Sequence, residues 1–274
     1  MRFGAHVSIA GGLDKCALRA VDLGLQTIQI FSRGPRGGKA RPIGDTELAG
    51  FSNTLSRHDV NPVVIHTPYY VNIASSDDSK REYSVQVLLE DLQRAKTIGA
   101  PYVVVHAGRN SDPVRGEALA IDSVDKALSY CPDGVMLLLE NTAGQGGELG
   151  HSICQLARLR NSDERVGICL DTCHAHAAGY DLSELSGWDR LASEVDAHIG
   201  WGVVRILHVN DAASPSGSFL DRHARIGEGS IGLSGFSLAA GCSMVNILPW
   251  ILETPVDSEE EYVKEIQMLR ALSQ

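Results

Sequence analysis

The feature that most constrains the fold is a short apolar, β-branched run that recurs eight times along the chain. Each run is followed by a polar loop and then by a segment of helical periodicity, a pattern typical of a parallel sheet. Eight such units in 274 residues predict a closed α/β barrel, a TIM (β/α)8 barrel, whose usual length is about 250 residues. We expect one domain over residues 1–274. The predicted strands are Arg2–Val7, Thr27–Phe31, Val63–His66, Tyr102–His106, Val135–Glu140, Val166–Asp171, Val204–Val209 and Asn246–Glu253.

Two stretches show the helical part of the pattern clearly. In the first, which ends at Gly99, apolar residues recur every three or four positions and predict one buried face. That face comprises Val85, Leu88, Leu89, Leu92, Ala95 and Ile98. The second is the last helix, where Ser258 and Glu261 have the spacing of a capping box.

Six of the predicted strands carry, at or next to their carboxyl ends, a residue type that binds metals. These residues are His66, His106, Glu140, Asp171, His208 and Glu253. In a parallel barrel the carboxyl ends of the strands meet at one mouth, where barrel active sites lie. Several desolvated carboxylates gathered there would cost on the order of several kcal/mol each. Because bound cations remove that cost, the strand ends predict a metal site.

Three more candidate ligands lie just beyond the strand ends. His174 follows Asp171 by three residues, while Asp221 and His223 form an Asp-x-His pair that faces one side of an extended segment. An ordinary polar loop is the alternative interpretation of this pair. The nine nitrogen and oxygen ligands suit Zn, Mn or Fe. Since a catalytic metal usually takes about three protein ligands, nine of them predict a cluster of two or three ions.

The charge of the chain is unevenly distributed. A formal net charge of −10 taken alone argues against a nucleic-acid partner. However, the segment Ser32–Pro42 contains Arg33, Arg36, Lys39 and Arg41 and no acid. We interpret this basic loop either as a solvated loop or as a surface that faces an anion, and divalent ions at the mouth would favour the second possibility.

The cysteines and the hydropathy bear on the location of the protein. The six cysteines are scattered and none has Cys-x-x-Cys spacing, which predicts reduced thiols. Cys173, between two candidate ligands, is expected to point away from the cluster. No apolar run reaches the roughly 18 residues of a membrane span, and the N-terminus lacks the apolar region of a signal peptide. These features predict a cytoplasmic protein without a membrane partner, and a monomer is the simplest expectation.

Seven motifs distributed over essentially the whole chain resemble the endonuclease IV family of apurinic/apyrimidinic DNA-repair enzymes. They are GAHVSIAGGL, HTPYYVN, LLLENTAGQGGELG, CLDTCHAHAAGYDL, LHVNDA, DRHARIGEGSIG and ILET. The resemblance implies a TIM barrel with three Zn²⁺ ions per chain, for which Mn²⁺ or Fe²⁺ could substitute. The first ion would be held by His66, His106 and Glu140. Glu140 would bridge to the second, which Asp171, His208 and Glu253 complete, and the third would be held by His174, Asp221 and His223.

The resemblance also implies an activity. The family hydrolyses the phosphodiester 5′ to an abasic site in duplex DNA, leaving a 3′-hydroxyl and a 5′-deoxyribose phosphate, and removes blocking groups from 3′ ends. A metal-bridged hydroxide would attack phosphorus in line, another metal would stabilise the 3′-oxyanion, and Glu140 would orient the nucleophile as the catalytic residue. Arg36, Tyr69 and Tyr70 match positions with which the family contacts DNA. His6, at the end of the first strand, is expected either to support a ligand or to contact phosphate.

Two other functions fit part of the pattern. A xylose isomerase-like, metal-dependent sugar isomerase or epimerase would need only Glu140, Asp171, His208 and Glu253, so His66, His106 and the Asp221/His223 pair favour the nuclease. A DNA-lesion binding protein with structural metals would carry closed and often cysteine-rich sites, unlike this oxygen-rich set.

Overall fold

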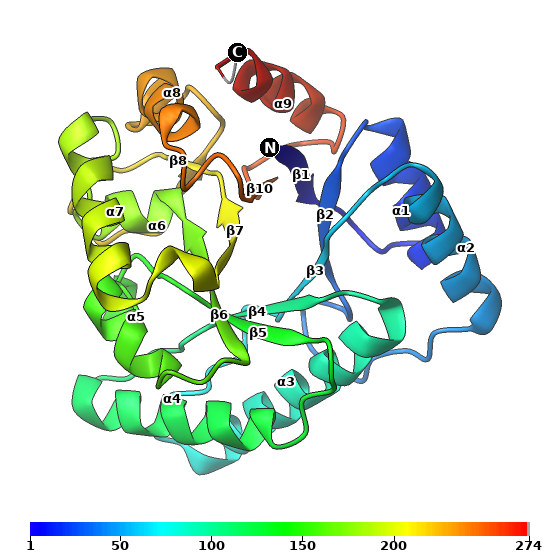
Figure 1. Ribbon diagram of the computed structural model, residues 1–274. Coiled ribbons are helices and arrows are strands. Elements are labelled where there is room, and N and C mark those ends of the chain that lie inside the picture. The colour runs from blue at the N-terminus through cyan, green and yellow to red at the C-terminus, as the bar shows by residue number, and fades with distance from the viewer. Residues whose placement is uncertain (273–274) are drawn as a thin grey trace.

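Eight parallel strands close into a barrel in the computed structural model, which describes residues 1–272 (Figure 1). Around the barrel the strands follow the order β1-β10-β7-β6-β5-β4-β3-β2. Their bounds are β1 Arg2–His6, β2 Thr27–Phe31, β3 Val63–His66, β4 Tyr102–His106, β5 Met136–Glu140, β6 Val166–Asp171, β7 Val204–His208 and β10 Pro249–Leu252. The predicted TIM barrel is thus confirmed, with each strand within a few residues of its predicted bounds. A single domain over residues 1–274 stays a prediction, and residues 273 and 274 lie outside the described residues.

Helices surround the barrel and connect its strands (Figure 1). The α-helices are α1 Leu13–Asp22, α2 Asp45–Arg57, α3 Asp78–Ile98, α4 Pro113–Leu128, α5 Ile153–Arg160, α6 Thr172–Ala177, α7 Leu185–His198, α8 Gly232–Gly241 and α9 Glu261–Leu272. Two short 3₁₀ helices are η1 Gln145–Gly147 and η2 Trp201–Val203, and a small antiparallel ribbon joins β8 Asp211–Ala212 to β9 His223–Ala224. The ribbon and the short helix α6 both belong to the loops at the mouth.

The inside of the barrel is filled with side chains. One apolar layer there consists of Val64, Val104, Leu138, Cys169, Ile206 and Ile251. A larger apolar core lies between the strands and the surrounding helices. The barrel is therefore a packed support for its mouth, as is usual for this fold.

Helix details differ from the predictions at two places. On α3, Val87 and Asp91 are buried while Val85 and Leu89 are only partly so; Asp91 tolerates burial because it pairs with a buried arginine. At the start of α9, the Glu261 carboxylate accepts from the Asp257 N–H at 2.9 Å. The predicted capping box pairs the Glu261 carboxylate with the Ser258 N–H, so the observed partner of Glu261 lies one residue earlier.

No helix within residues 1–272 is both long and apolar enough to cross a membrane. The monomeric state and the cytoplasmic location stay predictions from the sequence.

Candidate metal centre

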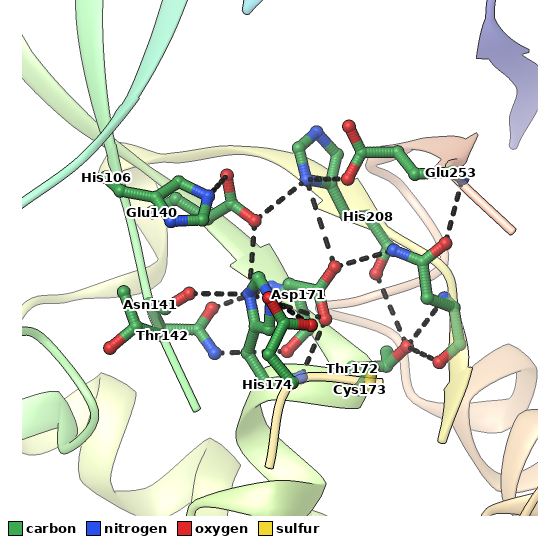
Figure 2. Close-up of polar contacts among 12 residues, drawn as sticks. His106, Glu140, Asn141, Thr142, Asp171, Thr172, Cys173, His174, His208 and Glu253 are labelled. Carbon is green, nitrogen blue, oxygen red and sulfur yellow. Dashed lines mark hydrogen bonds and ion pairs between the residues drawn. The ribbon is translucent and has the colours of Figure 1, made fainter. Parts of the chain in front are cut away.

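The carboxyl ends of the strands bring the predicted ligands together at one mouth of the barrel (Figure 2). Five of them end a strand, Glu253 directly follows β10, His174 lies on α6, and Asp221 and His223 lie at β9. Figure 2 shows the side chains of His106, Glu140, His174, His208 and Glu253 converging from separate elements. These residues are far apart in the sequence, and closure of the barrel brings them close together in space.

Glu140 lies at the centre of this arrangement and is fully buried. Its Oε2 lies 3.0 Å from His66 Nε2 and 3.2 Å from His106 Nε2. Its Oε1 lies 3.1 Å from His208 Nδ1 and 3.3 Å from His174 Nδ1. The two oxygens of one carboxylate thus face two different groups of ligand atoms, which is the geometry that lets a carboxylate bridge two cations.

The first group of ligand atoms comprises His66, His106 and Glu140. A second group lies on the Oε1 side of Glu140. It comprises Glu140, Asp171, His208 and Glu253, whose ligand atoms lie within 4.8 Å of one another. His208 Nδ1 is 3.2 Å from Glu253 Oε2 and 4.0 Å from Asp171 Oδ2. Three carboxylates and one imidazole around a common centre suit a divalent cation.

A third group lies where α6 meets the β9 loop. His174 Nε2 is 3.3 Å from Asp221 Oδ1, and His223 Nε2 is 3.5 Å from the same oxygen. His223 Nε2 is buried and has no hydrogen-bond partner. A buried, unpartnered nitrogen aimed at carboxylates is costly by itself and is what an imidazole ligand presents to a metal. The donor set of this structure therefore fits bound divalent cations.

In the protein without cations, the histidines and carboxylates of the centre shift each other's pKa values. Burial by itself raises the pKa of Glu140, but the nearby His208 and His106 hold that pKa well below its ordinary value. Burial lowers the pKa of His174, but Asp171, Asp221 and Glu140 raise it well above its ordinary value. Without cations, protonated histidines thus neutralise the ionised carboxylates, and cations compete with those protons.

Comparison with known proteins identifies the family. Residues 17–272 match the family described as xylose isomerase-like TIM barrel. The probable endonuclease 4 of Moorella thermoacetica is 40% identical over 99% of this chain and 99% of its own length. The crystal structure of endonuclease IV from Thermus thermophilus has a TM-score of 0.89 and 34% identity, covering 99% of this chain and 98% of that one. The chain belongs to the endonuclease IV family.

The fold alone is shared more widely than this family. A D-tagatose 3-epimerase-like protein superposes with a TM-score of 0.75 over 99% of this chain and 97% of its own, at 19% identity. Such a likeness shows the barrel fold alone, because the chemistry of a site depends on its side chains. In this member of the endonuclease IV family, the nine predicted ligands lie together at the mouth, including the histidines that the sugar-enzyme alternative does not need.

Two asparagines that sequence reasoning missed orient the candidate ligands of this endonuclease IV family member. Asn141 accepts the N–H of Asp171 at 2.6 Å and donates to the Asp171 carbonyl at 3.1 Å. Asn210 donates to Asp171 Oδ2 at 2.6 Å, and its Oδ1 accepts from the Glu253 N–H at 2.8 Å. The available signal was their position, because each lies one or two residues beyond the end of a strand that carries a ligand.

Asp211 was also missed, and it organises the loop that carries Asp221 and His223. It is fully buried. Its carboxylate accepts backbone N–H groups from Ala212, Gly227, Gly229, Ile231 and Gly232. A Cβ on Gly229 would lie 2.4 Å from Asp211 Oδ1, so the close approach of the loop to this carboxylate requires glycine. Asp211 therefore helps to place the third group.

The two predicted DNA-contacting tyrosines differ in exposure. Tyr69 is 72% exposed, beside a pocket of about 370 Å³ that opens next to the ligands. The residues that line this pocket include His66, His106, Tyr69, Arg109, Glu148 and Asp221. Tyr70 is half-buried and stacks on Tyr83 of α3, with ring centroids 6.0 Å apart. Of the pair, Tyr69 is the one free to contact a large ligand.

The basic loop is less available to an external anion than the sequence indicates. Arg33 is 3% exposed, and its guanidinium lies 3.0 Å from both Asp91 and Glu90. Arg41 pairs with Glu47 at the start of α2. Two of the four cations of the loop therefore form ion pairs within the fold, and both interpretations of the loop stay open for the other two. Arg36 and Lys39 are exposed.

His6 packs against two residues of β2. Gln29 Nε2 is 3.2 Å from His6 Nδ1, and the His6 ring packs on Phe31 with centroids 4.3 Å apart. Burial lowers the pKa of His6 despite the nearby Glu253. A neutral histidine supported in this way suits a role in holding the centre, which was one of its two predicted roles, and a phosphate contact stays a prediction.

The prediction that Cys173 points away from the cluster was wrong. Its Sγ lies within 4.8 Å of ligand atoms of Asp221 and His223, because α6 begins immediately after Asp171 and turns the chain. Cys169 Sγ likewise lies within 4.8 Å of ligand atoms of Glu140 and His208. Burial raises the pKa of both thiols to about 12, so both are neutral thiols in the protein alone.

Proposed function

We propose that this protein is an apurinic/apyrimidinic endonuclease that hydrolyses the phosphodiester 5′ to abasic sites in duplex DNA. The observation that carries the proposal is the position of Glu140, a buried carboxylate whose two oxygens face two separate groups of ligand atoms. Adjacent cations at an open mouth suit phosphoryl chemistry, in which attacking and leaving oxygens both carry negative charge. Membership of the endonuclease IV family supports the same activity.

The residues present suit three zinc ions, with Mn²⁺ or Fe²⁺ as possible substitutes. We assign His66, His106 and Glu140 to the first, and Glu140, Asp171, His208 and Glu253 to the second. We assign His174, Asp221 and His223 to the third. When bound, such ions lower the pKa of water toward neutrality and offset negative charge on the phosphate and on the departing 3′-oxygen.

The protein's own side chains supply position and exclusion of water. Glu140 is held by burial between four histidines, so its oxygens stay aimed at the reacting region. Its carboxylate is the proposed catalytic group, which orients the nucleophile in line with the scissile bond. Asn141 and Asn210 keep Asp171 in place from behind, which limits the reorganisation needed during the reaction.

Recognition of the lesion would use the rim of the mouth. An abasic nucleotide lacks stacking, so extruding it costs less than flipping an intact one. The exposed Tyr69 can enter the gap that the missing base leaves, and Arg36 can contact the adjacent backbone. Tyr70 would support Tyr69 from its stack on Tyr83. Removal of blocking groups from 3′ ends would use the same centre, because it breaks a phosphoester on the same side of the lesion.

The decisive experiment pairs elemental analysis with a nicking assay on a duplex that contains one abasic analogue. We expect about three zinc ions per chain and a single cut 5′ to the analogue, with an intact duplex as the control. A metal-loaded protein that binds the abasic duplex without cutting it would instead be a lesion-binding protein. One or two metals with turnover of a ketose and no cut would support the sugar epimerase.

A further inference from the structure

Strand β2 carries a polar side chain inside the barrel, among apolar neighbours. Gln29 pairs in register with Val64 of β3, which belongs to the apolar layer of the barrel interior. Gln29 is itself fully buried. A buried amide costs free energy unless its hydrogen-bonding groups find partners. The amide of Gln29 therefore needs hydrogen-bond partners at the mouth of the barrel.

The amide of Gln29 has three partners, all of them at the metal centre. Its Nε2 lies 2.5 Å from Glu253 Oε1 and 3.2 Å from His6 Nδ1. Its Oε1 lies 2.8 Å from His208 Nε2. Both N–H groups and the carbonyl oxygen are therefore engaged. One side chain thus connects two of the proposed ligands with the histidine that ends β1.

The Glu253 carboxylate determines which way the amide points. An ionised carboxylate can only accept hydrogen bonds, so the end of the amide that faces Glu253 must be the NH₂ group. The opposite end is then the oxygen, which can only accept, and its partner His208 Nε2 must carry a hydrogen. The protonated nitrogen of His208 is in this way specified by a residue of another strand.

We propose that Gln29 is a positioning residue that keeps Nε2 of His208 protonated and leaves Nδ1 as its metal-binding atom. Nδ1 faces the second group, at 3.1 Å from Glu140 Oε1 and 3.2 Å from Glu253 Oε2. Metal-binding histidines typically donate their other ring N–H to an oxygen, which fixes the ring and the protonated nitrogen. The inference rests on the proposed metal centre and adds to it a residue that touches no metal.

The same amide also orients Glu253. Because the NH₂ group engages Oε1, the other oxygen, Oε2, is left facing His208 Nδ1 and the second group. Gln29 therefore acts on two of the four ligands of that group at once. Its three hydrogen-bond partners include no residue of the first or third group, so these two groups should be affected much less.

The test compares full-length wild type with Gln29→Leu, which keeps the volume and removes the amide. Zinc affinity is measured by chelator competition, and the ring nitrogens of His208 are observed by long-range ¹H–¹⁵N spectroscopy of the zinc-loaded protein. In the wild type we expect a protonated Nε2 and a zinc-bound Nδ1. In Gln29→Leu we expect one of the three zinc ions to bind about 10- to 100-fold more weakly, the usual effect of removing such a partner.

Two further variants separate positioning from packing. Gln29→Glu keeps an oxygen acceptor for His208 but places a like charge beside Glu253, so we expect the Nε2–H signal to persist while zinc binding still weakens. The packing control is Val64→Ala. Val64 is the cross-strand partner of Gln29 and belongs to the apolar layer of the barrel interior. This variant should lower the thermal stability without changing zinc stoichiometry or the His208 signals.

Wild-type zinc affinity and unchanged His208 signals in Gln29→Leu would overturn the inference. If Gln29→Leu does not fold, Gln29→Glu decides, because loss of its Nε2–H signal would contradict the proposed role of the oxygen acceptor. The proposed function is judged separately, on the wild type. A wild type that binds zinc through His208 Nδ1 but does not cut abasic DNA would refute the function and leave this inference standing.

Discussion

The Asp171 carboxylate that ends β6 also caps the helix that carries His174. The His174 N–H donates to Asp171 Oδ1 at 2.7 Å, which sets the histidine one turn beyond the acid. His174 Nε2 then lies 3.3 Å from Asp221, while Asp171 Oδ2 lies 4.0 Å from His208 Nδ1. A single N-cap thus joins the second and third groups of candidate ligand atoms, so helix geometry fixes the position of one group relative to the other.

Glu140→Gln should abolish most nicking and leave DNA binding intact. The amide keeps the size of the side chain but loses the charge that faces two groups of ligand atoms. We expect the cleavage rate of an abasic duplex to fall by roughly 10²- to 10³-fold, or about 3–4 kcal/mol, with a dissociation constant within about threefold of wild type. Glu82→Gln, an exposed exchange on α3, is the control. Full activity in Glu140→Gln would refute the proposed orientation of the nucleophile.

Asp211→Asn should remove one metal rather than all three. The carboxylate accepts the N–H groups of Gly227 and Gly229 through Oδ2, and an amide NH₂ at that place would leave them unpaired. Each buried unpaired N–H costs about 1–3 kcal/mol. We expect a lower melting temperature and a zinc content reduced by about one per chain, measured by calorimetry and elemental analysis. The exposed exchange Asp189→Asn on α7 should change neither, and three zinc ions in Asp211→Asn would contradict the role of the loop.

The parts of this site that could be predicted are those fixed by strand topology. A His, Asp or Glu at the end of a parallel strand lies at the mouth whatever the surrounding loops do, so residues such as His66 and Glu253 could be placed from the pattern alone. The role of Gln29 could not be predicted. In the sequence, a polar residue within Thr27–Phe31 only interrupts an apolar strand, and its partners become known only from the structure. The burial of Arg33 likewise depends on Asp91, which lies on a helix distant in sequence.

The metal-free protein should lose stability as the pH rises, and zinc should remove that dependence. Burial lowers the pKa of His174, but Asp171, Asp221 and Glu140 raise it well above 6.5 in the folded state. A raised folded-state pKa contributes stability that is fully present below the unfolded value, about pH 6.5, and is lost as the pH rises through the folded value. Chemical denaturation of the metal-free protein at pH 6 and pH 9 measures the effect.

The same protons predict the pH dependence of zinc binding. Zinc must displace them from the histidines, so its affinity should fall on acidification, and titration calorimetry in buffers of different ionisation enthalpy should detect proton release at pH 7. Zinc binding at pH 7 without proton release, together with equal stability of the metal-free protein at both pH values, would show that the histidines are neutral in the absence of metal.

Arg36→Ala and Arg41→Ala should separate DNA contact from loop support. Both remove one positive charge from the basic loop, but Arg41 is paired with Glu47 while Arg36 is exposed. For Arg36→Ala we expect roughly fivefold weaker binding of the abasic duplex, or about 1 kcal/mol, and weaker discrimination against intact duplex. The slope of log affinity against log salt should fall by about one, the loss of one phosphate contact. Arg41→Ala should instead lower the melting temperature and keep the salt slope. Equal salt slopes in wild type and Arg36→Ala would exclude Arg36 from the DNA interface.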